Sequence, residues 1–341
     1  MSQVLDGAIE PAANTRLFGH ELAEAFLAGA YRSGRIHHAV LIEGPEGIGK
    51  ATLAFRFARH VLDHPDPARA PETLADGDPQ SPTFRQIVAG ASHHVLHLTR
   101  PIDEKTGRVK SAVTVDEVRR AGRLFSQTTG TGGWRIVIVD PADDLNRSAA
   151  NAILKMLEEP PRRSLFLVVS HAPGKLLPTI RSRCLTLRLN PLSPESLSSA
   201  IGHLPAAASV SPADLQKIII RADGSVARAL MMISYGGLDI LEAYEKALAN
   251  GGDRKAIHAL SDLLTAKDRE EAFQFFCDHV ERALAEDARA AALQGRLDHA
   301  DALARLASRT SEDLATAAAF NLDRKQTILS LFSSILQARA A

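Results

Sequence analysis

This sequence has few cysteines, no excess of charge of either sign and no long apolar run. Its 341 residues contain two cysteines, Cys184 and Cys277, which excludes a disulfide framework and indicates a reducing compartment. Lysine plus arginine and aspartate plus glutamate are 40 each, so no overall charge draws the chain to nucleic acid or to a membrane surface. The start from Met1 to Asn14 is polar and no run of about eighteen apolar residues exists, so we expect neither secretion nor membrane insertion but a cytoplasmic protein.

The first half of the chain has the pattern of a parallel α/β sheet domain. Short continuous runs of valine, isoleucine and leucine alternate there with helical stretches, as strands buried on both faces do. The predicted strands are Ala39 to Glu43, Val95 to Leu98, Arg135 to Asp140, Leu165 to Ser170 and Leu185 to Leu189. The segment from His64 to Ala91 is dense in proline, glycine and aspartate without a steady period, so we expect a long surface loop or a short helical excursion.

The second half of the chain has a purely helical pattern, because strand signals stop at about Pro191. Ser193-Pro194-Glu195 has the residues of a capped helix start. Apolar positions then recur at helical spacing over Ala256 to Leu264, Glu271 to Leu284 and Arg324 to Leu336. The predicted fold class is therefore α/β plus all-α, and the chain is long enough for two or three domains.

A nearly complete phosphate-binding loop follows the first predicted strand. It runs through Gly44, Pro45, Glu46, Gly47, Ile48, Gly49, Lys50 and Ala51. In a working loop, backbone N–H groups cradle the phosphates, the lysine reaches the terminal ones, and a serine or threonine hydroxyl at the last position holds Mg²⁺. Ala51 has no hydroxyl, and Thr52 lies one position late, where a helix turns its side chain by about 100°. The residues leave open whether the loop binds ATP or ADP weakly or is a turn that binds nothing, and they predict no metal ligand.

The carboxylate half of such a site is also incomplete. The run from Trp134 to Val139 supplies a hydrophobic strand, and Asp140 ends it. An active ATPase of the ring-forming type would continue with an acidic residue that polarises the attacking water, but position 141 is proline. The pattern therefore indicates a P-loop architecture that has lost hydrolysis.

The stretch from Asp140 to Cys184 carries the most specific pattern in the chain. It contains Asn146, the run Ala149-Ala150-Asn151-Ala152-Ile153-Leu154-Lys155-Met156-Leu157-Glu158-Glu159-Pro160-Pro161, and then Ser182-Arg183-Cys184. The run by itself indicates only a helix that ends at Pro160. Together, these residues resemble the clamp-loader branch of the AAA+ ATPases, whose members carry NALLK-LEEP followed by SRC. The resemblance covers most of residues 17 to 190.

The resemblance implies a fold in three parts. These are an AAA+ P-loop parallel-sheet domain over residues 1–190, a small helical lid domain over 191–237, and a C-terminal helical oligomerisation (collar) domain over 238–341. For Arg183, it implies the role of an arginine finger that reaches ATP bound by a neighbouring subunit. Such a role requires a permanently charged, forked donor. The residues alone allow the alternative that Arg183 makes a structural ion pair, and Cys184 is interpreted as a packing residue.

Positions in the two sensor motifs bear on whether this site hydrolyses ATP. Ser170 occupies the place of the polar residue that senses the terminal phosphate in active relatives, and His171 after it is interpreted as a satisfied surface histidine. The place of the second sensor holds Ala227, with Arg228 displaced by one residue. The lost sensor is independent of the departures at positions 51 and 141, so we expect no hydrolysis.

The sequence also departs from relatives that bind zinc. Members of this branch often carry a four-cysteine zinc module after the first helix, but no cysteine precedes Cys184, so we expect no zinc. His93 and His97 would stand about 13 Å apart on an extended strand, too far to share one metal ion. Together with His94 they are interpreted as polar residues at a strand edge.

The function that the resemblance implies is that of a clamp-loader subunit of the replicative DNA polymerase III. Such a subunit would hydrolyse no ATP itself and would offer Arg183 to the nucleotide of its neighbour. The implied partners are gamma/tau-type ATPase subunits and a delta subunit in the same ring and, through the complex, the sliding clamp and primed DNA. Two alternatives stay open: an active clamp-loader ATPase of the gamma/tau type, with an unusual metal ligand beside Asp140, and a P-loop scaffold without a finger.

Overall fold

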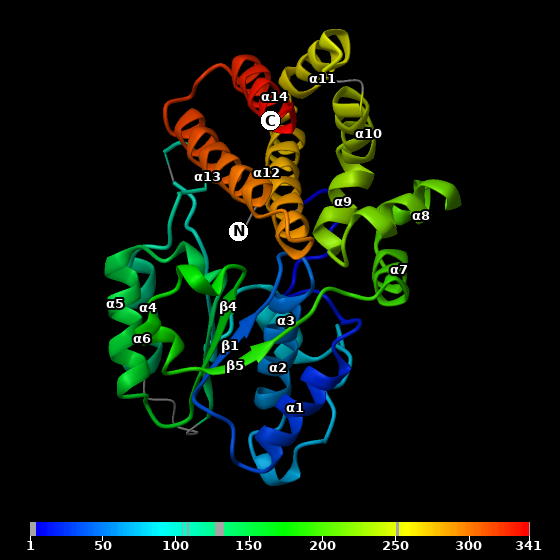
Figure 1. Cartoon of the computed structure of the whole chain (residues 1–341). Helices are drawn as coiled ribbons and strands as arrows, with labels where there is room; N and C mark the ends of the chain where they lie inside the picture. The colour runs from blue at the N-terminus through cyan, green and yellow to red at the C-terminus, as the bar shows by residue number, and fades with distance from the viewer. Residues whose placement is uncertain (1–4, 104, 108, 127–132, 250–251, 341) are drawn as a thin grey trace. The chain divides into compact units, whose positions relative to one another are not determined.

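The computed structural model describes residues 5–103, 105–107, 109–126, 133–249 and 252–340 (Figure 1). Residues 1–4 of the polar start, and residues 250, 251 and 341 of the predicted collar domain, lie outside this range. The chain divides into two compact units, Met1–Ala229 and Leu230–Ala341. The finer division implied by the resemblance, with a separate lid over residues 191–237, stays a prediction.

The first unit is built on a five-stranded sheet with the order β2-β3-β4-β1-β5, in which every pairing is parallel. The strands are β1 Ala39–Glu43, β2 Val95–Leu98, β3 Arg135–Val139, β4 Ser164–Ser170 and β5 Leu185–Arg188. Each predicted strand is confirmed to within one residue at either end. Because all strands run the same way, the phosphate loop after β1 and the carboxylate after β3 emerge at the same edge of the sheet.

Helices cover both faces of this sheet (Figure 1). The α-helices of the first unit and the one that runs across the division are α1 Glu21–Arg32, α2 Lys50–Asp63, α3 Pro82–Val88, α4 Val115–Ser126, α5 Arg147–Glu158, α6 Pro178–Arg181, α7 Pro194–Gly202, α8 Pro212–Arg221 and α9 Val226–Ser234. Ser193 caps α7 as predicted, since its Oγ accepts a hydrogen bond from the N–H of Ser196 at 3.2 Å.

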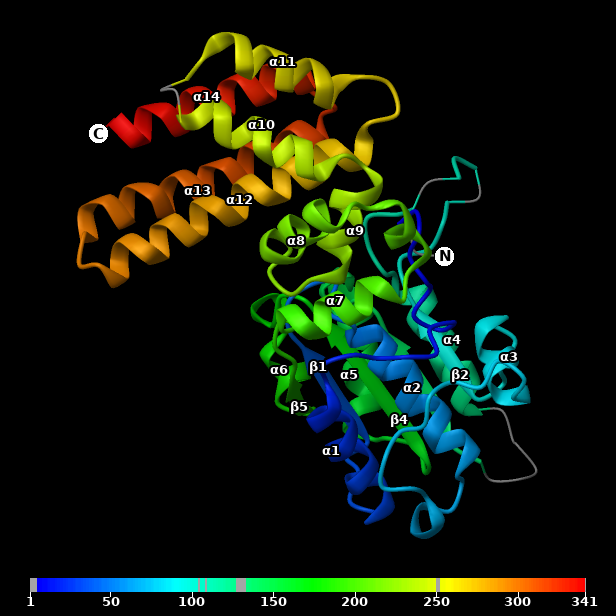
Figure 2. The same cartoon turned by 90° about the vertical axis from the view of Figure 1, so that its right-hand side faces the viewer.

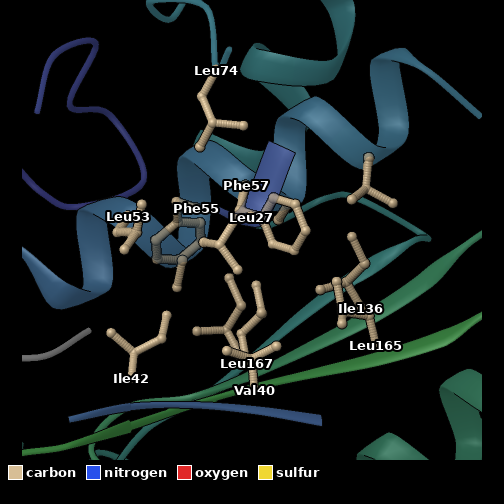
Figure 3. Close-up of a cluster of buried hydrophobic side chains, with 14 of the residues drawn as sticks. Leu27, Val40, Ile42, Leu53, Phe55, Phe57, Leu74, Ile136, Leu165 and Leu167 are labelled. Atoms are coloured by element: carbon tan, nitrogen blue, oxygen red, sulfur yellow. The ribbon is translucent and has the colours of Figure 1, made fainter. Parts of the chain in front are cut away.

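Alternate strand residues enter two separate hydrophobic clusters. Val40, Ile42 and Leu167 lie on one face and pack with Leu27, Leu53 and Phe57 of α1 and α2 (Figure 3). Their strand neighbours Leu41, Phe166 and Val168 lie on the other face with side chains of α4, α5 and α6. Side chains alternate across a strand, so uninterrupted apolar runs are needed when both faces are covered. The sheet domain therefore has three layers, with the sheet between two layers of helices, and the predicted parallel α/β fold is confirmed.

The segment from His64 to Ala91 is the predicted helical excursion, with a short 3₁₀ turn at Pro67–Arg69 and the helix α3. Two buried arginines of α2 hold it and the N-terminal segment in place. Arg56 donates to Glu24 Oε1 at 2.7 Å, to the carbonyl of Thr15 at 2.6 Å, to Asp76 Oδ1 at 3.1 Å and to the carbonyl of Leu74 at 3.4 Å. A single guanidinium thus joins α1, the N-terminal segment and the loop before α3.

Arg59, one turn further along α2, reinforces the same junction. It donates to the carbonyls of Ala12 at 2.9 Å and Asn14 at 3.0 Å, and its guanidinium lies over the ring of Phe84 at 5.0 Å from the centroid. Burial lowers the pKa of this guanidinium to about 10, which leaves it charged at neutral pH.

The second unit is helical throughout its described residues. Its further helices are α10 Gly237–Ala249, α11 Arg254–Thr265, α12 Glu270–Leu293, α13 Leu297–Ala319 and α14 Arg324–Ala340. The long helices α12 and α13 lie side by side (Figure 2). One hydrophobic cluster, including Tyr244, Phe276 and Phe332, joins the helices. Within the described residues, no helix combines the length and the apolar character needed to cross a membrane.

The folded state should lose stability in mild acid because of His60 on α2. His60 is 5% exposed, its ring packs against Tyr31 and Phe57, and its buried Nε2 has no hydrogen-bond partner in the described chain. Burial lowers the pKa of His60 to about 4. Between pH 6.5 and 4 the unfolded chain therefore binds the proton that the folded chain rejects, so stability is complete above pH 6.5 and falls as the pH drops through this window.

We expect the loss attributable to His60 to be about 1–3 kcal/mol between pH 7 and pH 4.5. Urea unfolding followed by circular dichroism over this pH range is the measurement. His60→Leu should flatten part of the pH dependence, whereas His258→Leu, at an exposed position, should leave it unchanged. An identical slope in the wild type and in His60→Leu would show that His60 is not the group that titrates.

Candidate functional site

The predicted phosphate loop connects β1 to α2, as a P-loop must. Gly47 and Gly49 have positive φ angles of 76° and 101°, which favour glycine. A Cβ atom at Gly47 would lie 2.4 Å from the side chains of Ala227 and Ser225. Glycine is therefore needed at position 47 both for the backbone conformation and for the close approach of another segment.

Lys50, the residue that would reach a nucleotide phosphate, is bound by the loop itself. Its Nζ donates to the carbonyl of Gly44 at 2.7 Å and also to the carbonyl of Pro45. Lys50 is only 3% exposed. Burial lowers the pKa of its ammonium to about 8, and the negative charges of Glu46 and then Asp140 oppose this shift. Ala51 and Thr52 follow in the first turn of α2, with Thr52 buried. The loop is closed around its own lysine.

The segment that begins at Gly224 covers the same loop. The N–H of Val226 donates to the carbonyl of Gly47 at 2.8 Å, and Ser225 Oγ donates to the carbonyl of Glu46 at 2.9 Å. Ala227 is the residue that meets Gly47, whereas Arg228 pairs with Asp223 at 2.6 Å. A methyl group, not a cation, thus occupies the place next to the loop.

A carboxylate that the sequence analysis did not identify, that of Asp143, accepts hydrogen bonds from the end of β4 and the residues after it. Its Oδ1 accepts from Ser170 Oγ at 2.7 Å, and its Oδ2 accepts from the backbone N–H groups of His171 at 2.6 Å and Ala172 at 3.3 Å. Ser170, in the predicted sensor position, is therefore committed to a structural bond. An available signal was the pairing of a polar residue at the end of β4 with an acidic residue just after the neighbouring strand β3.

The strand β3 ends at Val139, one residue earlier than predicted; Asp140 follows it directly, and Pro141 leads into the 3₁₀ turn Ala142–Asp144. The Oδ2 of Asp140 lies 3.7 Å from Nε2 of His97 on the edge strand β2. The charge of Asp140 also acts on Lys50. The buried Lys50 and the partly buried Asp140 and Asp143 therefore act on one another electrostatically at the carboxyl edge of the sheet.

The interpretation of His171 as a satisfied surface histidine is wrong. Its Nδ1 is buried without a hydrogen-bond partner in the described chain. Burial, and next the charge of Lys50, lower the pKa of the ring. The reason is topological: β4 lies between β3 and β1, so the residue after its end is partly buried and feels the charge of Lys50 in the phosphate loop.

The residues present do not fit a magnesium-bound nucleotide in the form that the structure shows. Position 51 supplies no hydroxyl ligand, the Lys50 ammonium is held by loop carbonyls, and the residue that lies against Gly47 is the uncharged Ala227. Among the described residues, no group of three or more histidine, cysteine, aspartate or glutamate side chains could hold a metal ion.

Arg183 lies on a different part of the first unit, in the turn after α6. Its Nη1 donates to the carbonyl of Thr179 at 3.0 Å, and its Nη2 lies 2.7 Å from Glu158 Oε1 at the end of α5. The side chain is 35% exposed. The ion pair anticipated as an alternative is thus present, and it leaves most of the five guanidinium N–H groups available to another partner.

Cys184 beside Arg183 packs against the hydrophobic cluster that includes Ile153 and Ile180. Burial raises the pKa of its thiol to about 11, so the thiol is neutral at physiological pH and its role is packing.

Comparison with known proteins finds relatives that cover most of this chain. The family model described as "DNA polymerase III, delta subunit" matches residues 19–193. The chain is 32% identical to DNA polymerase III subunit delta' of Pseudomonas aeruginosa over 250 residues, which cover 71% of this chain and 70% of that protein. It is 31% identical to the delta' subunit of Escherichia coli over 225 residues, covering 65% of this chain and 62% of that protein.

A tau subunit of the same polymerase is similar to nearly the same extent. DNA polymerase III subunit tau of Salmonella typhimurium is 28% identical over 272 residues, covering 79% of this chain. The match spans only 38% of the length of that tau subunit.

Proposed function

The chain belongs to the DNA polymerase III delta-subunit family, and from this premise we propose that it is the delta-prime-type subunit of the clamp loader. In this role it hydrolyses no ATP and supplies Arg183 to nucleotide bound by a neighbouring subunit. Membership of the clamp loader implies other clamp-loader subunits as partners. The finer assignments, namely gamma/tau-type ATPase neighbours, a delta subunit, the sliding clamp and primed DNA reached through the complex, are part of the proposal.

The observation that carries the proposal is the closed phosphate loop. Lys50 would have to leave the carbonyls of Gly44 and Pro45 before it could reach a phosphate. Even then, the terminal phosphate would be contacted by only one cation, Lys50, because the residue beside the loop is the uncharged Ala227. Binding of ATP or ADP through Gly44 to Lys50 is therefore proposed to be weak, and turnover to be absent.

A ring subunit that hydrolyses no ATP can still contribute through the surfaces that it presents to neighbouring subunits. Arg183 has the chemistry that a neighbouring site needs, because a planar guanidinium spreads a permanent charge over the oxygens of a transferring phosphoryl group. For the C-terminal helices over residues 238–341, we propose the collar role, since packed helices can bury a large apolar interface without nucleotide.

The purified chain is expected to hydrolyse no ATP above the rate of its Lys50→Ala variant, with or without Mg²⁺ and primed DNA. Ala51→Ser restores only one lost group, so it should stay inactive as well. Release of inorganic phosphate measured under saturating ATP is the assay. Magnesium-dependent turnover that disappears in Lys50→Ala would instead assign the chain to the active gamma/tau type.

Reconstitution of the clamp loader of the same organism with and without this chain tests the ring role. We expect assembly of clamps on primed DNA to require the chain, although it contributes no turnover of its own. Loading at the full rate in its absence would remove the chain from the loading reaction.

A further inference from the structure

The turn that carries Arg183 is fixed to its surroundings through the backbone. The N–H of Ser182 donates to the carbonyl of Pro178 at 2.9 Å, the N–H of Arg183 to that of Ile180 at 3.1 Å, and the N–H of Cys184 to that of Arg181 at 3.2 Å. Both this turn and the end of α5 stand on the same hydrophobic cluster. The Cα positions of Arg183 and Glu158 are therefore held relative to each other.

The side chain of Arg183 needs a further restraint, because arginine has many rotamers and loses their entropy when it acts. Two contacts supply it: the carbonyl of Thr179 on α6 at 3.0 Å and the carboxylate of Glu158 on α5 at 2.7 Å. They anchor the guanidinium from two elements at once. The remaining N–H groups stay available, as a group that serves another molecule requires.

We propose that Glu158 is a positioning residue that pre-orders the Arg183 guanidinium for the nucleotide of the neighbouring subunit. The inference rests on the proposed function, because Glu158 acts only through Arg183. Pre-ordering raises the rate of the neighbour's hydrolysis by removing the need to fix the guanidinium at the moment of reaction.

A purely structural role does not account for the pair. The side chains of Arg183 and Glu158 are 35% and 49% exposed, and ion pairs at such positions contribute little to stability. Substitution of Glu158 should thus leave folding and assembly unchanged, which makes it a clean probe of function.

The test uses the full chain in the reconstituted complex, with ATP, the sliding clamp and primed DNA. Glu158→Ala and Glu158→Gln are each expected to lower the stimulated ATP turnover at saturating ATP by about 2- to 5-fold, with KM for ATP unchanged. Glu159→Ala is the matched control, because it removes an exposed carboxylate one residue further along that makes no ion pair in the described chain. Complex formation is checked by size-exclusion chromatography before each assay.

A double-mutant cycle with Arg183→Ala decides how Glu158 acts. We expect Glu158→Ala to have no further effect when Arg183 is already alanine. An equal effect in both backgrounds, a rise in turnover, the same result for Glu158→Ala and Glu159→Ala, or loss of assembly in both Glu158 variants would overturn the inference. If Arg183→Ala lowers turnover while Glu158→Ala does not, the proposed function stands and only the positioning role is lost. If Arg183→Ala itself has no effect, both are lost.

Discussion

Replacing Arg56 with methionine is expected to lower the free energy of unfolding by about 3–5 kcal/mol, the range found when one partner of a buried charge pair is removed. Arg56 is 4% exposed and donates to two carboxylates and two backbone carbonyls. Methionine fills a similar volume but leaves Glu24 and the carbonyls of Thr15 and Leu74 without this donor. Unsatisfied buried acceptors carry the full cost of their desolvation.

Guanidinium-induced unfolding of the full chain measures the change. Arg16→Met is the matched control, because Arg16 contacts the same carboxylate of Asp76 but is 56% exposed, so we expect a change within about 0.5 kcal/mol. Glu24→Gln combined with Arg56→Met should cost less than the sum of the two single changes, since the stranded carboxylate is gone. A loss below about 1 kcal/mol for Arg56→Met would mean that solvent or a relaxed loop satisfies these acceptors.

The arrangement of the sheet could be predicted from the sequence because it depends on a local pattern. Runs such as Leu165 to Ser170 are apolar at every position, and only a strand covered on both faces places successive side chains in two different cores. The structure assigns Leu165 and Phe166 to opposite clusters accordingly. Helix ends followed from caps and stops in the same way, as the cap at Ser193 and the stop before Pro160 show.

The end of α12 could not be predicted in this way. The pattern indicated a helix from Glu271 to Leu284, whereas the helix continues to Leu293. Its last turns bury Ala288 and Ala291 at helical spacing after Leu284, but alanine gives only a weak apolar signal, and its helix propensity sustains these turns.

The candidate site was predictable as a set of positions but not as a set of contacts. The loop follows β1, Asp140 follows β3, and Ser170 ends β4. The bond from Ser170 to Asp143, the buried Nδ1 of His171 and the carbonyls that hold Lys50 depend on which strands become neighbours. A sequence motif gives the residue types along the chain, so it cannot show that the lysine donates hydrogen bonds to carbonyls of its own loop.

The contacts of Arg56 and Arg59 could not be predicted either. The sequence predicts their helix from its apolar positions alone. A sequence shows these arginines as charged residues, and charged residues are normally exposed. Their burial follows from acceptors far along the chain, such as the carbonyls of Ala12 and Thr15.

Replacing Arg183 with alanine is expected to reduce clamp loading by the reconstituted complex by about 10-fold or more, because an arginine finger contributes a factor on the order of 10³ at the site it serves. Folding and assembly should be unaffected, since the side chain is partly exposed and its ion pair with Glu158 contributes little to stability. Bulk ATP hydrolysis will fall less than loading if other sites in the ring stay active. Both rates should therefore be measured on the same preparation, with primed DNA and the sliding clamp present.

The variant Arg183→Lys tests whether the forked shape of the guanidinium is needed in addition to its positive charge. Lysine keeps the positive charge but cannot form two parallel hydrogen bonds to a phosphoryl group, so it should restore only a small part of the lost rate. If Arg183→Ala complexes assemble and load clamps at the wild-type rate, the trans-acting role is removed and the pair with Glu158 is structural only. Full rescue by lysine would instead mean that a point charge at this edge is sufficient.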